Sequence, residues 1–280
     1  MPDELEIAIP GLRLAARAWG PADAPPVLCL HGWLDNAATF DRVLPLLDGH
    51  RFVALDLPGH GRSQHKPLGA SYAFIDAVAD VAMVLDALGW QRATLLGHSL
   101  GGAISACIAG AQPDRVEKLA LLDGLAPLSE AAELTAERLG KALIEQREKA
   151  DRRPPVHASV EDAARRLGST FARLSPEAAR TLCSRGLIEV EGGVTWASDP
   201  RLRWTSRVRL MEEQVLALLG AIRCPVLMIR ASEGLWSDSP WLQRRVDAVQ
   251  NARVVTLPGT HHVHLEDPEP VAAVLREFLA

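Results

Sequence analysis

The feature that most constrains the fold of this chain is a serine enclosed by glycines, between a strand-like run and a helix-like run. The motif Gly97-x-Ser99-x-Gly101 follows the strand-like residues 93–96 and precedes residues 100–111, which are rich in small side chains and lack proline. A serine on a sharp strand-to-helix turn projects its hydroxyl, and only small neighbours let the backbone pass so closely. The pattern therefore predicts a strand, a tight turn and a helix, with Ser99 as the candidate nucleophile.

Short, continuous apolar runs recur along the chain, and most are followed by a turn and a helical pattern. Such runs suit strands buried on both faces of a parallel sheet, and their alternation with helices indicates an α/β fold. Ligands of such sheets bind at the carboxyl ends of the strands. The runs are residues 27–30, 52–55, 95–96, 119–122, 226–229 and 254–255. The helical patterns are residues 38–47, 74–88, 100–111, 241–249 and 270–279, and residues 5–9 and 12–19 alternate as in a hairpin.

One region interrupts this alternation. Between about residues 126 and 214 there is no buried-strand run, but charged amphipathic patterns follow helix-start signals at Ser159 and Ser175. We expect residues 126–214 to form a helical cap inserted between two parts of an α/β core, residues 1–125 and 215–280. Within the expected cap, residues 190–194 suggest a small hairpin-like turn.

Composition restricts the partners of the chain. The 280 residues are 48% hydrophobic, and 30 Lys and Arg against 35 Asp and Glu give a net charge of −5 without a concentrated basic run, so we expect no nucleic-acid partner. The N-terminus is acidic, and no apolar run approaches the roughly 18–20 residues of a membrane span, so we expect a cytoplasmic protein without such a span. The four cysteines lack C-x-x-C spacing and are expected to be buried thiols.

Four motifs carry a resemblance to a known family. They are residues 30–36, 56–63, 97–102 and 258–268, which read LHGWLDN, DLPGHGRS, GHSLGG and PGTHHVHLEDP. The chain resembles an α/β-hydrolase over nearly its full length and, within that superfamily, the serine hydrolase-like proteins. The resemblance implies an α/β-hydrolase fold, with a mostly parallel central sheet flanked by helices and an inserted helical cap.

A serine hydroxyl is a poor nucleophile at neutral pH unless a histidine takes its proton and an acid orients that histidine. The resemblance implies where in the chain this histidine lies. Many relatives end in the pattern Gly-His-x-x-His-x-x-x-Pro. Aligned backwards from Pro268, this pattern puts the base at His261, with Thr260 where many relatives have glycine. His262 is the alternative base, and His264 is expected to support the loop through a hydrogen bond.

Two carboxylates are candidates for the acid of this expected catalytic triad. After residues 226–229 many relatives carry an aspartate in a Gly-x-x-Asp turn, but here Gly234 stands at that position, one residue after Glu233. Asp123 closes the run 119–122, where related small acyl esterases place their acid. We therefore expect Asp123 to be the acid, with Glu233 as the alternative. A carboxylate that only caps the start of the inserted segment is the structural alternative for Asp123.

The resemblance also implies an oxyanion hole and a substrate pocket. The backbone N–H groups of Leu100, at a helix N-terminus, and of Trp33 are the expected oxyanion donors. A mainly apolar pocket would suit a hydrophobic acyl or aryl ester, although core packing is the alternative for any single tryptophan. The candidate pocket residues are Leu34, Trp196, Trp204 and Trp236, and Trp33 and Trp241 are further candidates.

These residues together predict a carboxylesterase-like serine hydrolase. Ser99 would form an acyl-enzyme, and water activated by His261 would release the acid. A serine in this position excludes the alkyl-ester route of related dehalogenases and epoxide hydrolases, which requires an aspartate there. The chain lacks H-E-x-x-H, P-loop and dinucleotide fingerprints, so we expect no metal and no cofactor. A thioesterase, acyltransferase or carbon–carbon bond hydrolase with the same triad remains an alternative, as does a non-enzymatic small-ligand receptor.

Overall fold

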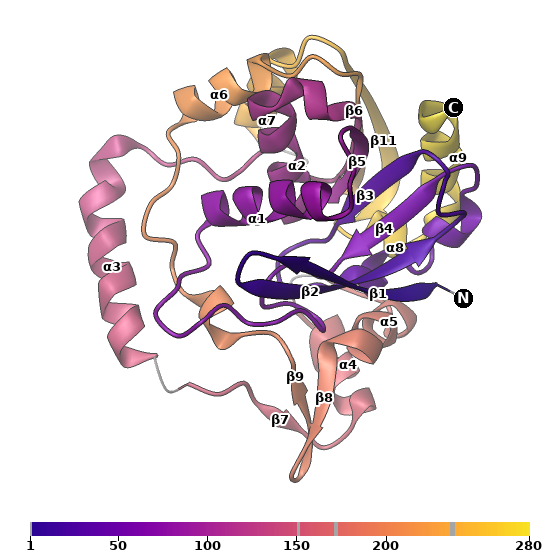
Figure 1. The fold of residues 1–280 in the computed structure, drawn as a ribbon. Coiled ribbons are helices and arrows are strands. Elements are labelled where there is room, and N and C mark those ends of the chain that lie inside the picture. The colour runs from indigo at the N-terminus through magenta and orange to yellow at the C-terminus, as the bar shows by residue number, and fades with distance from the viewer. Residues whose placement is uncertain (1, 150–151, 171–172, 236–238) are drawn as a thin grey trace.

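A central sheet organises the computed structural model of the chain, which describes residues 2–149, 152–170, 173–235 and 239–280. Its eight strands have the order β1-β2-β4-β3-β5-β6-β10-β11 (Figure 1). β2 is antiparallel to both of its neighbours, and every other neighbouring pair is parallel. The predicted α/β-hydrolase fold with a mostly parallel sheet is confirmed.

The predicted apolar runs form the middle of this sheet because their side chains are buried on both faces. Leu28, Leu95 and Leu119, from three neighbouring strands, are fully buried. The predicted hairpin is the pair β1 and β2. The strands are β1 Asp3–Ile9, β2 Leu12–Trp19, β3 Pro26–Leu30, β4 Arg51–Leu55, β5 Ala93–His98, β6 Val116–Leu122, β10 Val226–Glu233 and β11 Ala252–Thr260.

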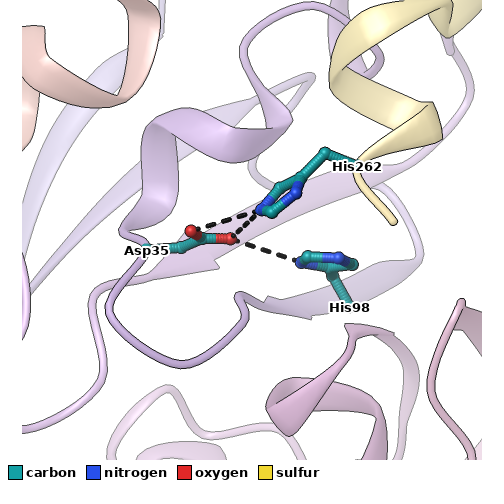
Figure 2. A group of neighbouring side chains, drawn as sticks. All are labelled: Asp35, His98 and His262. Atoms are coloured by element: carbon teal, nitrogen blue, oxygen red, sulfur yellow. Dashed lines mark hydrogen bonds and ion pairs between the residues drawn. The ribbon is translucent and has the colours of Figure 1, made fainter. Parts of the chain in front are cut away.

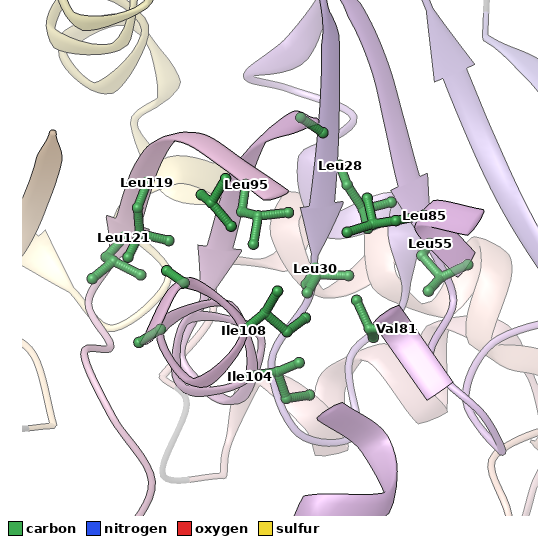
Figure 3. Packing of buried hydrophobic residues seen from close by; sticks show 14 of the residues in the cluster. Leu28, Leu30, Leu55, Val81, Leu85, Leu95, Ile104, Ile108, Leu119 and Leu121 are labelled. Atoms are coloured by element: carbon green, nitrogen blue, oxygen red, sulfur yellow. The ribbon is translucent and has the colours of Figure 1, made fainter. Parts of the chain in front are cut away.

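Helices cover both faces of the sheet and create two apolar clusters. On one face, Val81, Ile104 and Ile108 pack against the strand leucines (Figure 3). On the other face, Phe40 and Leu275 belong to the second cluster. The first face carries α1 Phe74–Ala87, α2 Leu100–Ala111, α6 Glu212–Gly220 and α7 Pro240–Asp247; the second carries α9 Pro268–Leu279, preceded by the short α8 Val263–Glu266.

The prediction of a helix over residues 38–47 is wrong. This stretch forms two short 3-10 helices, Ala37–Phe40 and Leu44–Leu46. Pro45 has no N–H to donate to the carbonyl four residues earlier, so a continuous α-helix is disfavoured. The first turn is instead closed by the side chain of Asn36, whose Oδ1 accepts from the N–H of Ala38 at 3.0 Å.

Residues 126–214, which we call the inserted segment, contain helices and a second, small sheet. Ser159 and Ser175 cap α4 and α5 as their sequence signals predicted, and the predicted hairpin is the antiparallel pair β8 and β9. The expected boundary at residue 214 lies inside α6, whose Val215 belongs to the main core. The elements are α3 Thr135–Glu148, β7 Val156–His157, α4 Val160–Gly168, α5 Pro176–Gly186, β8 Leu187–Val190 and β9 Gly193–Trp196.

Two further predictions concern the cysteines and the membrane. Cys29, Cys107, Cys183 and Cys224 are buried free thiols, as expected. Every helix in the described residues is too short or too polar to cross a lipid bilayer.

Candidate active site

The turn between β5 and α2 holds Ser99 in a strained backbone conformation. Ser99 has φ +50° and ψ −112°, a left-handed conformation that costs free energy for any residue with a side chain. Its N–H donates to the carbonyl of Leu122 at 3.1 Å. A Cβ on Gly101 would lie 2.0 Å from the carbonyl oxygen of Leu30. Glycine at this position therefore lets the helix approach β3, and the predicted tight turn at Ser99 is observed.

His261 and Asp123 form a buried pair beside this turn. His261 Nδ1 lies 2.6 Å from Asp123 Oδ2. An ionised carboxylate only accepts hydrogen bonds, so Nδ1 carries the proton, and the neutral ring keeps its lone pair on Nε2. The Asp123 carboxylate also accepts from the backbone N–H groups of Ala231 at 3.1 Å and Leu235 at 3.3 Å. These contacts fix the orientation of the carboxylate and, through it, that of the imidazole.

Backbone contacts connect the serine turn to both members of this pair. A Cβ on Gly124, the residue after Asp123, would lie 2.6 Å from the Cα of Ser99. His98, the residue before Ser99, donates from Nε2 to the carbonyl of His261 at 3.1 Å. The fold thus gathers Ser99, Asp123 and His261 at the carboxyl ends of β5, β6 and β11.

The alternative acid and the alternative base have other partners. The exposed carboxylate of Glu233 lies 3.5 Å from Arg173 Nη2, and His262 Nε2 lies 3.1 Å from Asp35 Oδ2. A Cβ on Gly234 would lie 2.4 Å from both carboxylate oxygens of Asp123. The place where many relatives carry an aspartate is therefore filled by the carboxylate of Asp123. These contacts favour Asp123 over Glu233, and His261 over His262.

A small cavity of about 130 Å³ lies beside the serine turn. Trp33 and Leu100, the two residues expected to supply oxyanion donors, both line it. Trp204 lines it as predicted, together with Leu202 from the inserted segment. The indole Nε1 of Trp33 donates to the carbonyl of Leu202 at 3.0 Å. The cavity is therefore built jointly by the core and by the inserted segment.

Other candidate pocket residues have different surroundings. Trp196 packs against the buried alanines and leucines of α4 and α5, with its ring centroid 6.4 Å from that of His157, and it is not among the lining residues of the cavity. Leu34, at φ +64° in the turn after β3, does not line it either. The indole of Trp241 lies against the Arg245 guanidinium, 4.3 Å from ring centroid to Cζ. Trp236 is outside the described residues.

The cavity also contains polar residues that the sequence patterns did not reveal. Lys66 Nζ and Asp80 Oδ2 form an ion pair at 2.8 Å in its wall. The hydroxyl of Tyr72 donates to Asp199 Oδ2 at 2.8 Å, and burial raises the pKa of Tyr72. Lys66 and Tyr72 belong to an irregular stretch without periodicity, so no sequence signal pointed to them. His264 Nε2 lies 2.9 Å from Thr39 Oγ1, which is the loop-supporting hydrogen bond expected of it.

Known proteins are similar to this chain in sequence and in fold. Residues 25–268 match the family described as alpha/beta hydrolase fold. The chain is 36% identical to a serine hydrolase-like protein of Danio rerio, over 99% of this chain and 88% of that protein. It is 35% identical to serine hydrolase-like protein 2 of Homo sapiens, over 99% of this chain and 93% of that protein.

Solved structures show the same likeness. The hypothetical protein PA1622 from Pseudomonas aeruginosa PAO1 is 42% identical, with a TM-score of 0.96 and 99% of both chains covered. A thioesterase domain from the curacin biosynthetic pathway is 28% identical, with a TM-score of 0.86, over 98% of this chain and 99% of that domain.

Proposed function

The chain belongs to the α/β-hydrolase fold family, together with serine hydrolase-like proteins, and on that premise we propose that it cleaves an ester-type bond through an acyl-enzyme on Ser99. The observation that carries this proposal is the 2.6 Å contact between His261 Nδ1 and Asp123 Oδ2 beside the strained serine turn. That pair supplies the oriented base that a serine nucleophile requires.

The reaction would proceed in two halves. His261 Nε2 takes the proton as Ser99 Oγ attacks the carbonyl carbon, and the N–H groups of Leu100 and Trp33 stabilise the oxyanion. His261 then gives the proton to the leaving alcohol, and the acyl group remains on Ser99. In the second half the same imidazole activates a water, which releases the acid and restores the serine. Asp123 stays ionised throughout and stabilises the imidazolium form of His261.

The inserted segment would act as a cap that selects the acyl group. Leu202 and Trp204 from this segment line the same cavity of about 130 Å³ as Trp33 and Leu100. A site of this volume holds a small group, and the tryptophans and leucines of the wall favour an apolar one beside the polar side chains of Lys66, Tyr72 and Asp80. We therefore assign a short hydrophobic acyl or aryl ester as the substrate class.

A thioester is the second candidate substrate. The likeness to the thioesterase domain of the curacin pathway, at 28% identity over 98% of this chain, favours it. The same triad can expel a thiolate, which is a better leaving group than an alkoxide. Esters and thioesters of one acyl group separate the two substrates directly.

The test compares the native chain with Ser99→Ala on p-nitrophenyl esters of increasing acyl length and on the matching thioesters. We expect Ser99→Ala to lower kcat by about 10⁴-fold or more. Ser105→Ala is the matched control, because Ser105 lies in α2 and donates to the carbonyl of Gly101 at 2.7 Å. This variant should retain kcat within roughly threefold. Equal, slow turnover by all three proteins would refute the esterase proposal for these substrates.

A further inference from the structure

The buried residues Asp35, His98 and His262 form a second Asp–His arrangement (Figure 2). Asp35 follows β3, His98 ends β5 and His262 follows β11. Asp35 Oδ2 lies 3.1 Å from His262 Nε2 and 3.4 Å from His98 Nδ1. One ligand atom from each residue lies within 4.8 Å of the other two, and all three residues are at most 8% exposed. Two imidazoles and a carboxylate from distant parts of the chain thus converge on one point.

Within this arrangement, the Nδ1 atom of His98 lacks a hydrogen-bond partner among the described residues. His98 Nε2 faces the carbonyl of His261 at 3.1 Å, and a carbonyl only accepts, so that nitrogen carries the hydrogen. In neutral His98 the lone pair on Nδ1 then faces a carboxylate oxygen of Asp35. Accordingly, Nδ1 makes no hydrogen bond among the described residues. His98 Nδ1 and Asp35 Oδ2 are therefore two acceptor atoms that face each other at 3.4 Å.

We propose that Asp35, His98 and His262 form a binding site for a divalent transition-metal ion, with Zn²⁺ as the ion that fits best. Two imidazole nitrogens and one carboxylate oxygen are a ligand set that zinc uses in proteins. Tetrahedral bonds of about 2.0–2.2 Å put neighbouring ligand atoms roughly 3.3–3.6 Å apart. The two contacts of Asp35 Oδ2, at 3.1 and 3.4 Å, are close to this separation.

The surroundings of His98 support this assignment. A ligating histidine usually donates its other ring N–H to a carbonyl or a carboxylate, which fixes the ring. His98 does so to the carbonyl of His261. A Cβ on Gly32 would lie 2.9 Å from His98 Nδ1 and 3.0 Å from Asp35 Oδ2. Glycine at position 32 therefore keeps side-chain atoms away from the point where these two ligands meet.

The site is distinct from the proposed triad, but neighbouring residues join the two. His98 precedes Ser99 and His262 follows His261 in the chain. A bound ion would therefore tie the serine turn to the loop of the catalytic histidine. Because the folded protein binds the ion and the unfolded chain does not hold these ligands together, Zn²⁺ should raise the melting temperature.

The experiment is a calorimetric titration of the full-length, chelator-treated protein with Zn²⁺, followed by crystallography with anomalous scattering at the zinc edge. We expect one ion per chain, with its anomalous peak between Asp35, His98 and His262. His262→Gln should weaken binding by about tenfold or more, since loss of even an outer-shell partner typically costs 10–100-fold. Glutamine keeps an N–H that can donate to Asp35.

His157→Gln is the matched control. His157 is also buried, and its Nδ1 lies 3.5 Å from Asp162 Oδ2. Among the described residues, however, no second histidine joins His157 and Asp162 to complete a set of three metal ligands. This variant should bind Zn²⁺ as tightly as the native chain. Asp35→Asn provides a second disrupted site, and circular dichroism establishes which variants are folded.

The outcomes separate clearly. Stoichiometric binding that is weakened in His262→Gln or Asp35→Asn, but retained in His157→Gln, supports the metal site. The proposal is overturned if the native chain binds no Zn²⁺, if both ligand variants bind it unchanged, or if the anomalous peak lies between Asp123 and His261. Should both ligand variants fail to fold, the position of the peak in the native protein decides.

Discussion

The core and the inserted segment are held together by different forces. In the core, apolar side chains of the strands and helices form two large buried clusters, one on each face of the sheet. In the inserted segment, the buried apolar cluster is small and rich in alanine, and α3 buries only Ala142. The core thus has a large hydrophobic driving force, whereas the inserted segment depends more on its polar contacts.

Two buried arginines make several of those polar contacts. Arg185 of α5 donates to Asp56 and to Glu4 of the core, each at 2.8 Å, and its side chain is only 1% exposed. Arg245 of α7 donates to Glu212 and to the carbonyl of Pro127, at opposite ends of the inserted segment. Directional contacts of this kind fix position but depend on complete pairing. The core therefore carries the proposed triad and most of the cavity wall, and the inserted segment completes that wall.

The largest effect is expected in the core, at the acid of the proposed triad. Asp123→Asn should lower kcat by about 10⁴-fold, because an amide no longer holds His261 in the required tautomer. The measurement is steady-state hydrolysis of the preferred p-nitrophenyl ester. Glu233→Gln is the control and should change kcat by less than about twofold, since the Glu233 carboxylate pairs with exposed Arg173. If Glu233→Gln lowers kcat more than Asp123→Asn does, Glu233 is the acid.

The attachment of the inserted segment is tested at Arg185. Arg185→Met should lower the free energy of unfolding by about 3–5 kcal/mol, because it leaves the buried Asp56 carboxylate without its cation. Denaturant unfolding measures this change. The control is Arg166→Met, since Arg166 is 69% exposed in its pair with Asp162 and should contribute less than about 1 kcal/mol. Equal losses would mean that the buried ion pair does not anchor the segment.

The shape of the cavity is tested at Trp204. Trp204→Ala should lower kcat/KM for the preferred ester by roughly 10–100-fold and shift the preference toward longer acyl chains, because it removes part of the apolar wall. A series of acyl lengths measures both effects. Trp196→Phe should leave the preference unchanged, since Trp196 packs within the inserted segment. An unchanged profile in Trp204→Ala would place acyl selection elsewhere.

The smallest effect concerns the pH dependence of the second arginine contact. The hydrogen bond from Arg245 lowers the pKa of Glu212 in the folded protein. A lowered carboxyl pKa contributes stability above the unfolded value of about 4.3 and loses it as the pH falls through the folded value. Glu212→Gln should therefore be less stable than the native chain at pH 7, and the difference should shrink below about pH 4.

Chemical unfolding across this pH range measures the difference. Glu213→Gln alters the exposed neighbour of Glu212 and should show no such convergence. If the difference between Glu212→Gln and the native chain is constant from pH 7 to pH 3, the contact with Arg245 does not stabilise the end of the inserted segment.

Local sequence determined the elements of the core and the turn that carries Ser99. Continuous apolar runs specify buried strands, and glycines around Ser99 specify a tight turn. Each of these structures depends on residues that are close together in the sequence. The helix expected over residues 38–47 failed for a local reason as well, since the missing N–H of Pro45 outweighed the apolar pattern. Local sequence also predicted the N-caps at Ser159 and Ser175.

Only the tertiary structure decided which acid and which histidine pair. Asp123 and His261 are far apart in the sequence, and Glu233 and His262 offer the same chemistry at neighbouring positions. The packing of β6 beside β10 puts Gly234 against the Asp123 carboxylate, while the turn after β11 directs His261 to Asp123 and His262 to Asp35. Sequence patterns report the short-range preferences of a chain, but partner choice depends on distances that long-range packing sets.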